Sequence, residues 1–437
     1  MIRSFLHTME NGLRVVCVEM PHLHSAELAV FLKVGGRNDP HGREGLSHVL
    51  EHILFRGTAD FSSSLDIEAA FEDIGGAPNA ATDAESTCYY SRVHPDHVAR
   101  GMEIFASMLM RPAFNGVDIE KRIIAEEARE DLNEEEIETN PDTIVSRLLW
   151  PRHPLGMPTI GTLDSIAATT LDDLQRHHAA YYVPSNTVLA VSGPLRSHEV
   201  FAAARSAFGD WKEGSTPGSR LFVQSSAGRP VLKLVQDSDS QMGLQIAFLG
   251  LHRGDPRHME VRLLRRILAG GGSSRLHLLL RETLGIIYSV EGAIGAYDET
   301  GCIAFDLSTA PETLAQAVEG VLGELKRIAA EPVPADELER VRRSYIYDLE
   351  YSRDSAYDMT GRYGWGELMG FVRSIEDDCR AAADVTAEGL QATARLLFEP
   401  GNLRLVAVGP WKRGMKRQVQ DLVNGYSSSF TVRKHGI

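Results

Sequence analysis

The sequence predicts two related domains, each with a β-sheet covered by helices. Its 437 residues suit two domains of roughly 200 residues each. Strand-like segments alternate with amphipathic helical segments in both halves, which is typical of a sheet with helices packed on it. A segment rich in Gly, Ser and Pro divides the chain nearly in half. We therefore expect domains at residues 1–212 and 230–437, with a linker at 213–229.

The two halves resemble diverged copies of one another. A strand-like segment at residues 27–34 matches one at 244–249, and the helical segment 48–54 aligns with 262–268. A helix pair at 101–110 and 118–131 is matched by 313–329 and 336–350. A repeat of this length indicates duplicated domains rather than a solenoid of short units.

The composition is that of an acidic globular protein. Hydrophobic residues make up 43% of the chain and charged residues 24%, and the formal net charge is -15. A nucleic-acid binder would show the opposite charge balance or a concentrated basic face, so we expect no nucleic-acid partner. A solvated acidic surface is the simpler interpretation of this charge, and a preference for basic ligands is the alternative.

The cysteines and the first residues bear on the compartment. Cys17, Cys88, Cys302 and Cys379 are scattered and form no C-x-x-C pair, which argues against a thiolate zinc cluster and fits a reducing compartment. The first residues contain no apolar signal core, and no apolar stretch reaches the length of a membrane span. These features predict a protein without a membrane span that is cytoplasmic, or else one exported by a route that the sequence does not reveal.

A predicted helix carries two histidines and a glutamate in a pattern typical of metal sites. His48 and His52 are four residues apart, so their side chains project from the same face of a helix. Neutral imidazoles suit zinc, and Glu51 lies where it could reach a metal-bound water without occupying a coordination position. Together they form an H-x-x-E-H motif, which is far more specific than a histidine pair alone.

A later acidic helix offers candidates for a third ligand. Glu120 and Glu127 are seven residues apart and share one face, so one could bind the metal while the other holds a ligating histidine. The residues alone leave the choice open, because the same helix also carries Glu126 and Glu130.

The motif lies in a longer stretch that resembles a known family. Gly42-Arg-Glu-Gly-Leu-Ser-His-Val-Leu-Glu-His-Ile-Leu-Phe-Arg-Gly-Thr58 is similar to the signature of the inverzincin peptidases, the family of pitrilysin, insulin-degrading enzyme and mitochondrial processing peptidase. The resemblance covers nearly the whole chain. It extends to Gly35-Gly-Arg-Asn-Asp39, Ile74-Gly-Gly-Ala-Pro-Asn-Ala-Ala-Thr82, Pro154-Leu-Gly-Met-Pro-Thr-Ile-Gly161, Tyr182-Val-Pro-Ser-Asn186, Gly270-Gly-Gly-Ser-Ser-Arg-Leu276 and Leu280-Arg-Glu-Thr-Leu-Gly-Ile-Ile-Tyr-Ser289.

The resemblance implies a fold and a set of roles. The fold would be α+β, with two homologous domains that each pack a largely antiparallel sheet against helices, as in mitochondrial processing peptidase. One zinc ion per chain would be bound in the first domain, with Glu51 as the general base. The implied residues are His48, His52 and Glu127 as ligands, Glu120 as the acid that supports a ligand, and Asn79, Ala80, Ala81 and Thr82 as the strand that pairs with substrate.

The second half has no counterpart of the metal motif. Arg262, Arg265 and Arg266 stand in the places of His48, Glu51 and His52, and Ile346 falls where Glu127 would be. The resemblance instead implies that Arg281 and Tyr288 of this half face the zinc across a chamber.

The function implied is a zinc-dependent endopeptidase that hydrolyses peptides or unfolded segments inside a dimeric clamshell chamber. Two copies of this chain would suffice, since each carries both sets of residues, and a heterodimer with a related subunit is the alternative. The second candidate function is a non-catalytic or partner subunit of a heterodimeric processing peptidase, for example one that removes leader peptides.

Overall fold

The computed structural model describes residues 2–217 and 228–431, which form two compact units. The first unit contains Met1–Glu130, Met157–Arg220 and Leu349–Ser374, and the second contains Asp131–Gly156, Leu221–Asp348 and Ile375–Ile437. Each half of the chain therefore contributes one segment to the other unit. Residues 218–227 of the expected linker lie outside the described residues, and the domain boundaries at 212 and 230 stay a prediction.

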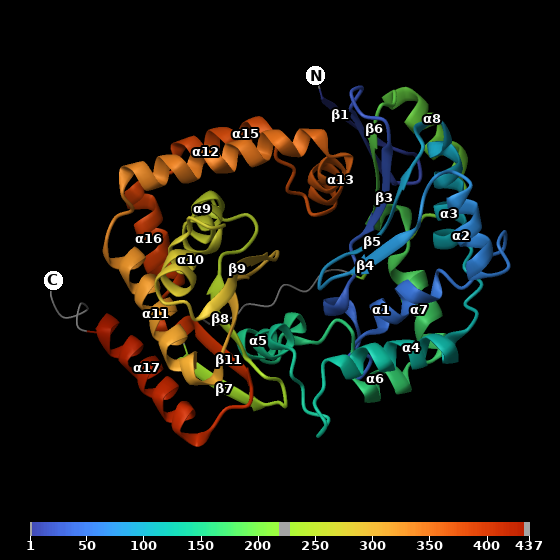
Figure 1. Cartoon of the computed structure of the whole chain (residues 1–437). Coiled ribbons are helices and arrows are strands. Elements are labelled where there is room, and N and C mark those ends of the chain that lie inside the picture. Colours follow the sequence, from blue (N-terminus) through green and yellow to red (C-terminus); the bar gives the residue numbers. More distant parts are fainter. Residues whose placement is uncertain (1, 218–227, 432–437) are drawn as a thin grey trace. The chain divides into compact units, whose positions relative to one another are not determined.

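The first unit is built on a six-stranded mixed sheet (Figure 1). Neighbouring strands are antiparallel except for β2 and β6, which are parallel. The order across the sheet is β1 (Arg3–Thr8), β2 (Arg14–Glu19), β6 (Thr187–Gly193), β3 (Ala26–Leu32), β5 (Thr87–Val93) and β4 (Asn79–Thr82).

One face of this sheet packs against helices to form the main core. Leu28 and Val30 of β3 and Tyr89 of β5 point into it and are fully buried. The helices that share this core are α1 (Leu46–Ile53), α2 (Ser64–Glu72), α3 (Val98–Met110), α4 (Val117–Glu130), α6 (Leu163–Ala168), α7 (Leu171–Tyr181) and α8 (Ser197–Phe208).

The opposite face of the sheet is covered in part by the segment contributed from the second half. This segment contains α13 (Ala356–Thr360), the π-helical turn η8 (Gly361–Trp365) and α14 (Gly366–Leu368). The Thr360 hydroxyl lies 2.7 Å from that of Ser192 on β6. Because both faces of β3 are covered, all seven of its residues are buried.

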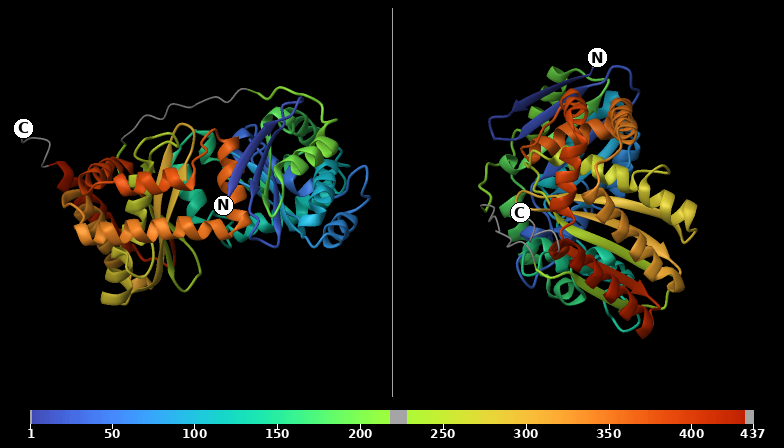
Figure 2. Two further views of the ribbon diagram at one scale, coloured as in Figure 1. Left: turned by 90° about the horizontal axis from the view of Figure 1, so that it is seen from above. Right: turned by 90° about the vertical axis from the view of Figure 1, so that its left-hand side faces the viewer.

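The second unit repeats this plan on a five-stranded mixed sheet. The order is β7 (Val231–Gln236), β11 (Leu403–Gly409), β8 (Met242–Gly250), β10 (Gly301–Thr309) and β9 (Ile287–Ala296), with β7 and β11 parallel. In Figure 2 the red helix α17 (Arg413–Thr431) runs beside α11 (Leu314–Ala330). The core helices include α9 (His258–Ala269), α10 (Arg275–His277), α12 (Ala335–Tyr351) and α16 (Ala387–Leu397). Helix α15 (Ile375–Asp384) packs against α9. Helix α5 (Pro141–Leu149) packs against β8 and β11.

The predicted fold class is confirmed, because both units pack a mixed, mainly antiparallel sheet against helices. The predicted repeat is visible in the elements themselves. Strand β3 corresponds to β8, helix α1 to α9, and the pair α3 and α4 to α11 and α12.

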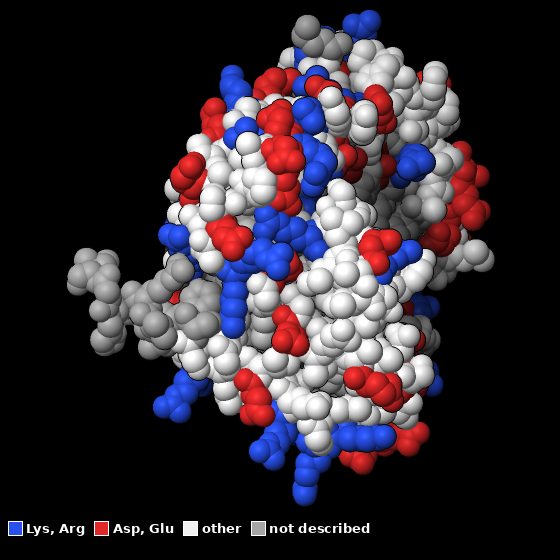
Figure 3. All heavy atoms as spheres, turned by 60° about the vertical axis from the view of Figure 1, so that its left-hand side comes forward, with Lys and Arg blue, Asp and Glu red and all other residues white. Residues whose placement is uncertain are grey.

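The surface charges and the character of the helices agree with the composition of a globular protein. On the face shown in Figure 3, Lys and Arg side chains are interspersed with Asp and Glu. Within residues 2–217 and 228–431, no helix combines the length and the apolar character that a membrane span requires.

Gly364 provides a test of how η8 docks on the sheet. A Cβ added to it would lie 2.4 Å from Cβ of Ala190 and 2.7 Å from the ring of Phe31. We expect Gly364→Ala to lower the free energy of unfolding by about 1–3 kcal/mol through overpacking. The measurement is urea-induced unfolding followed by circular dichroism.

Gly361 is the matched control, since a Cβ there meets nothing within 4 Å. Gly361→Ala should be neutral or stabilise by up to about 1 kcal/mol, because alanine is the better helix former. Equal stabilities of the two variants would contradict close packing at Gly364.

Candidate metal centre

Helix α1, which carries the histidine motif, begins at a glycine that no other residue could replace easily. Gly45 caps the helix with φ of 87°, in the left-handed region. A Cβ at this position would lie 2.4 Å from the carbonyl oxygen of Ile160. The start of α1 is therefore fixed by a close approach to the loop that precedes α6.

A buried carboxylate caps the first turn of α1. Asp39 accepts hydrogen bonds from the backbone N–H groups of Gly45 (2.8 Å) and Ser47 (3.0 Å) and from the Ser47 hydroxyl (2.6 Å). The Ser47 hydroxyl also lies 2.9 Å from Nε2 of the buried His177 on α7. Burial raises the pKa of Asp39 to about 7, and its oxygens accept from N–H groups that the first turn of a helix leaves without intrahelical partners. These hydrogen bonds stabilise α1 where the motif begins.

Three side chains from α1 and α4 converge on one point. His48, His52 and Glu127 each offer a ligand atom within 4.8 Å of the other two, and they form the single such group of three that the described residues contain. Nε2 of His48 lies 3.9 Å from Oε1 of Glu127, and the two imidazole rings meet edge to face with centroids 4.7 Å apart.

A shared carboxylate orients one of the two imidazoles. Glu120, only 4% exposed, accepts a hydrogen bond from Nδ1 of His52 at 2.9 Å and also binds the guanidinium of Arg56. With Nδ1 engaged in this way, Nε2 of His52 is the nitrogen left to face an ion. Glu120 thus ties α4 to α1 at the centre of the site.

The electrostatics of His48 suit a metal ligand. Burial, with a smaller contribution from the neighbouring His52, lowers the pKa of His48 to about 4. The ring is therefore neutral near pH 7, the form that binds metals. Two imidazoles and one carboxylate form a donor set that suits zinc, so the residues present fit this ion.

Glu51 lies beside the three converging side chains but is held by a different partner. Its carboxylate accepts a hydrogen bond from the Thr82 hydroxyl at 2.6 Å, and the residue is only 7% exposed. Burial raises the pKa of Glu51, and the Thr82 hydrogen bond offsets part of that rise. A carboxyl group with a raised pKa is suited to exchange a proton near neutral pH.

The strand predicted to pair with substrate lies at the edge of the sheet. Strand β4 pairs with β5 on one side, and no described strand pairs with its other side. Its residues alternate, with Asn79 and Ala81 exposed and Ala80 and Thr82 half-buried. Thr82 has a contact that the sequence did not indicate, since its hydroxyl binds Glu51. Substrate pairing along β4 stays a prediction.

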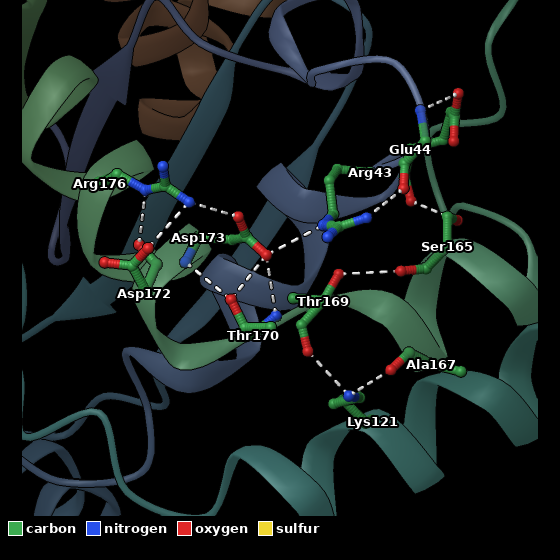
Figure 4. A network of polar contacts seen from close by, with 11 residues as sticks. Arg43, Glu44, Lys121, Ser165, Ala167, Thr169, Thr170, Asp172, Asp173 and Arg176 are labelled. Atoms are coloured by element: carbon green, nitrogen blue, oxygen red, sulfur yellow. Dashed lines mark hydrogen bonds and ion pairs between the residues drawn. The ribbon is translucent and has the colours of Figure 1, made fainter.

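A polar network holds both metal-site helices in place (Figure 4). Next to Glu120 on α4, Lys121 donates to the carbonyls of Ala167 (2.6 Å) and Thr169 (2.8 Å) at the end of α6. Just before α1, Arg43 donates to Asp173 of α7 at 2.9 Å. The geometry of the two helices thus depends on α6 and α7 as well as on the sheet.

Arg281 and Tyr288 belong to the second unit. The Arg281 guanidinium carbon lies 5.1 Å from the centre of the Tyr288 ring, and Tyr288 is 81% exposed. An exposed tyrosine stacked with an arginine is free to meet a ligand. Their predicted part in catalysis stays a prediction.

The three arginines that replace the motif in the second half are engaged in structural contacts. Arg262 binds the Tyr345 hydroxyl and Asp378, Arg265 donates to the carbonyl of Gly292, and Arg266 binds Asp348. The described residues of this unit contain no group of three metal-ligating side chains.

Sequence reasoning missed the supporting residues. Asp39 lies shortly before the motif and His177 far beyond it along the chain, and no spacing rule connects either residue to it. Arg56 is closer in sequence, since it follows His52 by four residues and lies just beyond the end of α1.

Two family models and several known proteins match this chain. Residues 14–163 match the family model described as insulinase (peptidase family M16), and residues 168–345 match that of the peptidase M16 inactive domain. A protein of Mycobacterium tuberculosis (strain ATCC 25618 / H37Rv) named as an uncharacterized zinc protease is 30% identical over 423 residues, covering 95% of this chain and 96% of that protein.

Solved structures share the fold. The structure of a protease from Helicobacter pylori matches with a TM-score of 0.87 at 20% identity, covering 94% of this chain and 100% of that chain. The periplasmic protease PqqL from Escherichia coli matches with a TM-score of 0.79 at 17% identity, covering 97% of this chain but 50% of that one.

Glu120 gives a test of the site that does not depend on catalysis. Glu120→Gln removes the charge that holds Nδ1 of His52, and we expect zinc affinity to fall by about 10- to 100-fold. Competition with a chromogenic chelator measures this change.

Glu126→Gln is the control on the same helix, because Glu126 is exposed and pairs with Arg129. Its zinc affinity should equal that of the unaltered protein. The same loss of zinc affinity in both variants would mean that α4 is disturbed generally. Unchanged zinc affinity in both variants would show that Glu120 does not support the site.

Proposed function

Because the chain belongs to peptidase family M16, we propose that it is a zinc-dependent endopeptidase acting on peptides or unfolded segments. The observation that carries the proposal is the group His48, His52 and Glu127, with the buried carboxylate of Glu51 beside it. The description of the matched second half as an inactive domain supports one zinc ion per chain. Four free cysteines support a reducing compartment, the cytoplasm.

The proposed chemistry assigns separate tasks to these residues. A zinc ion held by His48, His52 and Glu127 would supply Lewis acidity, which makes water nucleophilic near neutral pH and polarises a carbonyl. Glu51 takes the proton from the attacking water and passes it to the departing amine nitrogen. Thr82 holds the Glu51 carboxylate in position through its 2.6 Å hydrogen bond.

Substrate binding is assigned to the open edge of the first sheet. A peptide in extended form adds to β4 through main-chain hydrogen bonds, which accept many sequences. This places its backbone beside Thr82 and therefore near Glu51.

Arg281 and Tyr288 complete the site in the proposal, and they come from a second copy of the chain. The Tyr288 hydroxyl donates to the oxyanion that forms at the scissile carbonyl, and Arg281 binds a neighbouring carbonyl of the substrate. The match to half of the PqqL chain supports a fold that functions as a pair of such halves. Two copies of this chain supply both sets of residues, so the proposed assembly is a homodimer.

Glu51→Gln tests the proton transfer. The amide keeps the size of the side chain but cannot accept the proton, so kcat/KM for a quenched peptide should fall by about 10²- to 10⁴-fold. Zinc content, measured by elemental analysis, should be unchanged. Glu130→Gln on α4 is the control for a lost surface carboxylate. Retention of full activity by Glu51→Gln would end the role of Glu51.

Mixing two inactive variants tests the shared site. Tyr288→Phe should lower kcat by about 10²-fold, through loss of one oxyanion donor. When Glu51→Gln and Tyr288→Phe chains exchange subunits, a mixed dimer contains one site with both side chains intact. Random exchange should restore roughly a quarter of the original activity. No recovery, with exchange verified by mass spectrometry, would contradict a site built from two chains.

A further inference from the structure

A pocket lies between the first sheet and the segment that the second half of the chain contributes to this unit. Its volume is about 300 Å³, at the lower end of the range of small-ligand sites. Side chains of β3, β4 and β5 line it on one side and those of α13 and η8 on the other, all within the first unit. The group of metal-ligating side chains is on the other face of this sheet, where Thr82 meets Glu51.

The strand register places a polar end and an apolar floor in this pocket. On β3, Glu27, Ala29 and Phe31 alternate to the same face, and all three line the pocket. Tyr90 of β5 is directly opposite Ala29, and Cys88 is directly opposite Phe31. Because a strand rises about 3.3 Å per residue, Ala29 is about 7 Å and Phe31 about 13 Å from Glu27 along β3. Apolar side chains therefore follow Glu27 along the floor.

The carboxyl group of Glu27 is buried without a hydrogen-bond partner. Glu27 is 3% exposed, and its side chain makes no hydrogen bond or ion pair with any described residue. Burial raises the pKa of Glu27 to about 7, and the exposed Arg92, directly opposite on β5, offsets only part of that rise. An ionised carboxyl group in this position costs free energy, which a cation with hydrogen-bond donors would offset.

An aromatic pair lies beside Glu27. Tyr90 is its diagonal neighbour across β3 and β5, a separation that aromatic side chains can span. The ring of Tyr90 meets that of Tyr357 on α13 with centroids 5.9 Å apart. Aromatic faces attract ammonium groups. On the other side of Glu27, the Ser192 hydroxyl of β6 is engaged by Thr360 at 2.7 Å.

We propose that this pocket binds a small primary amine with a short apolar stem. The ammonium group donates to Glu27 and contacts the face of Tyr90, and the stem lies over Ala29 toward Phe31 and Cys88. Strand β3 is two strands inward from the open edge at β4, so the ligand is a separate molecule and not part of a peptide bound at that edge. The inference goes beyond the proposed peptidase function, because it requires neither zinc nor turnover.

Two ligands of the same length that differ in charge test the pocket. Calorimetric titration of the zinc-loaded protein at pH 8 compares n-pentylamine with 1-pentanol. At this pH the amine and Glu27 both carry their charges. We expect the amine to bind about tenfold or more tightly than the alcohol, since hydrogen bonds between charged partners are the strong ones. Equal affinities, or no binding of the amine, would overturn the inference.

Glu27→Gln tests whether the amine is bound where we propose. The amide keeps the shape of the side chain and removes its charge, so the affinity for n-pentylamine should fall to that for 1-pentanol. Glu68→Gln is the control, because Glu68 lies exposed on α2 and does not line the pocket. It loses the same charge and should keep the preference for the amine. A preference that Glu27→Gln leaves intact would mean that the amine binds elsewhere, for example to zinc, and the inference would fail.

A series of amines tests the apolar floor without any change to the protein. From methylamine to n-pentylamine, the affinity should rise by about fourfold for each methylene group that the pocket buries. Affinity that does not change along the series would contradict a stem lying over Ala29 toward Phe31.

Discussion

The hydrogen bond between Glu120 and His52 is the interaction on which the proposed metal centre depends. One buried carboxylate binds the non-ligating nitrogen of His52 and the guanidinium of Arg56, so it joins α4 to α1. Without this link the third side chain, Glu127, would be carried by a helix free to shift relative to the histidines. The three donors converge because both helices are also held by α6 and α7, through Lys121 and Arg43.

The two faces of the first sheet have different surroundings. One face packs on α1 and presents Thr82 to Glu51, and the other carries the pocket around Glu27. A single edge strand, β4, borders both, since its side chains alternate between them.

The two units differ in chemistry although their elements correspond. In α1 the helix face carries His48, Glu51 and His52, whereas α9 carries Arg262, Arg265 and Arg266 in the same register. The arginines bind side chains and a carbonyl of their own unit and so replace a metal centre with structural contacts. The repeated fold thus tolerates loss of the metal group because the sheet and helices are stabilised by their apolar cores.

The sequence alone determined the repeat, the alternation of strands and helices, and the position of the motif on one helix. Local periodicity decides these features, since residues four apart share a helix face whatever surrounds them. Spacing in the sequence did not choose between Glu120 and Glu127 as the third ligand, because both lie on one face of α4. In the tertiary structure Glu120 forms a hydrogen bond with His52, and Glu127 lies beside the two histidines. Only the folded chain decided the contacts of His177 with Ser47, of Thr82 with Glu51, and of residues 349–374 with the first sheet. These contacts join segments distant in sequence, and packing in three dimensions, rather than local preference, selects them.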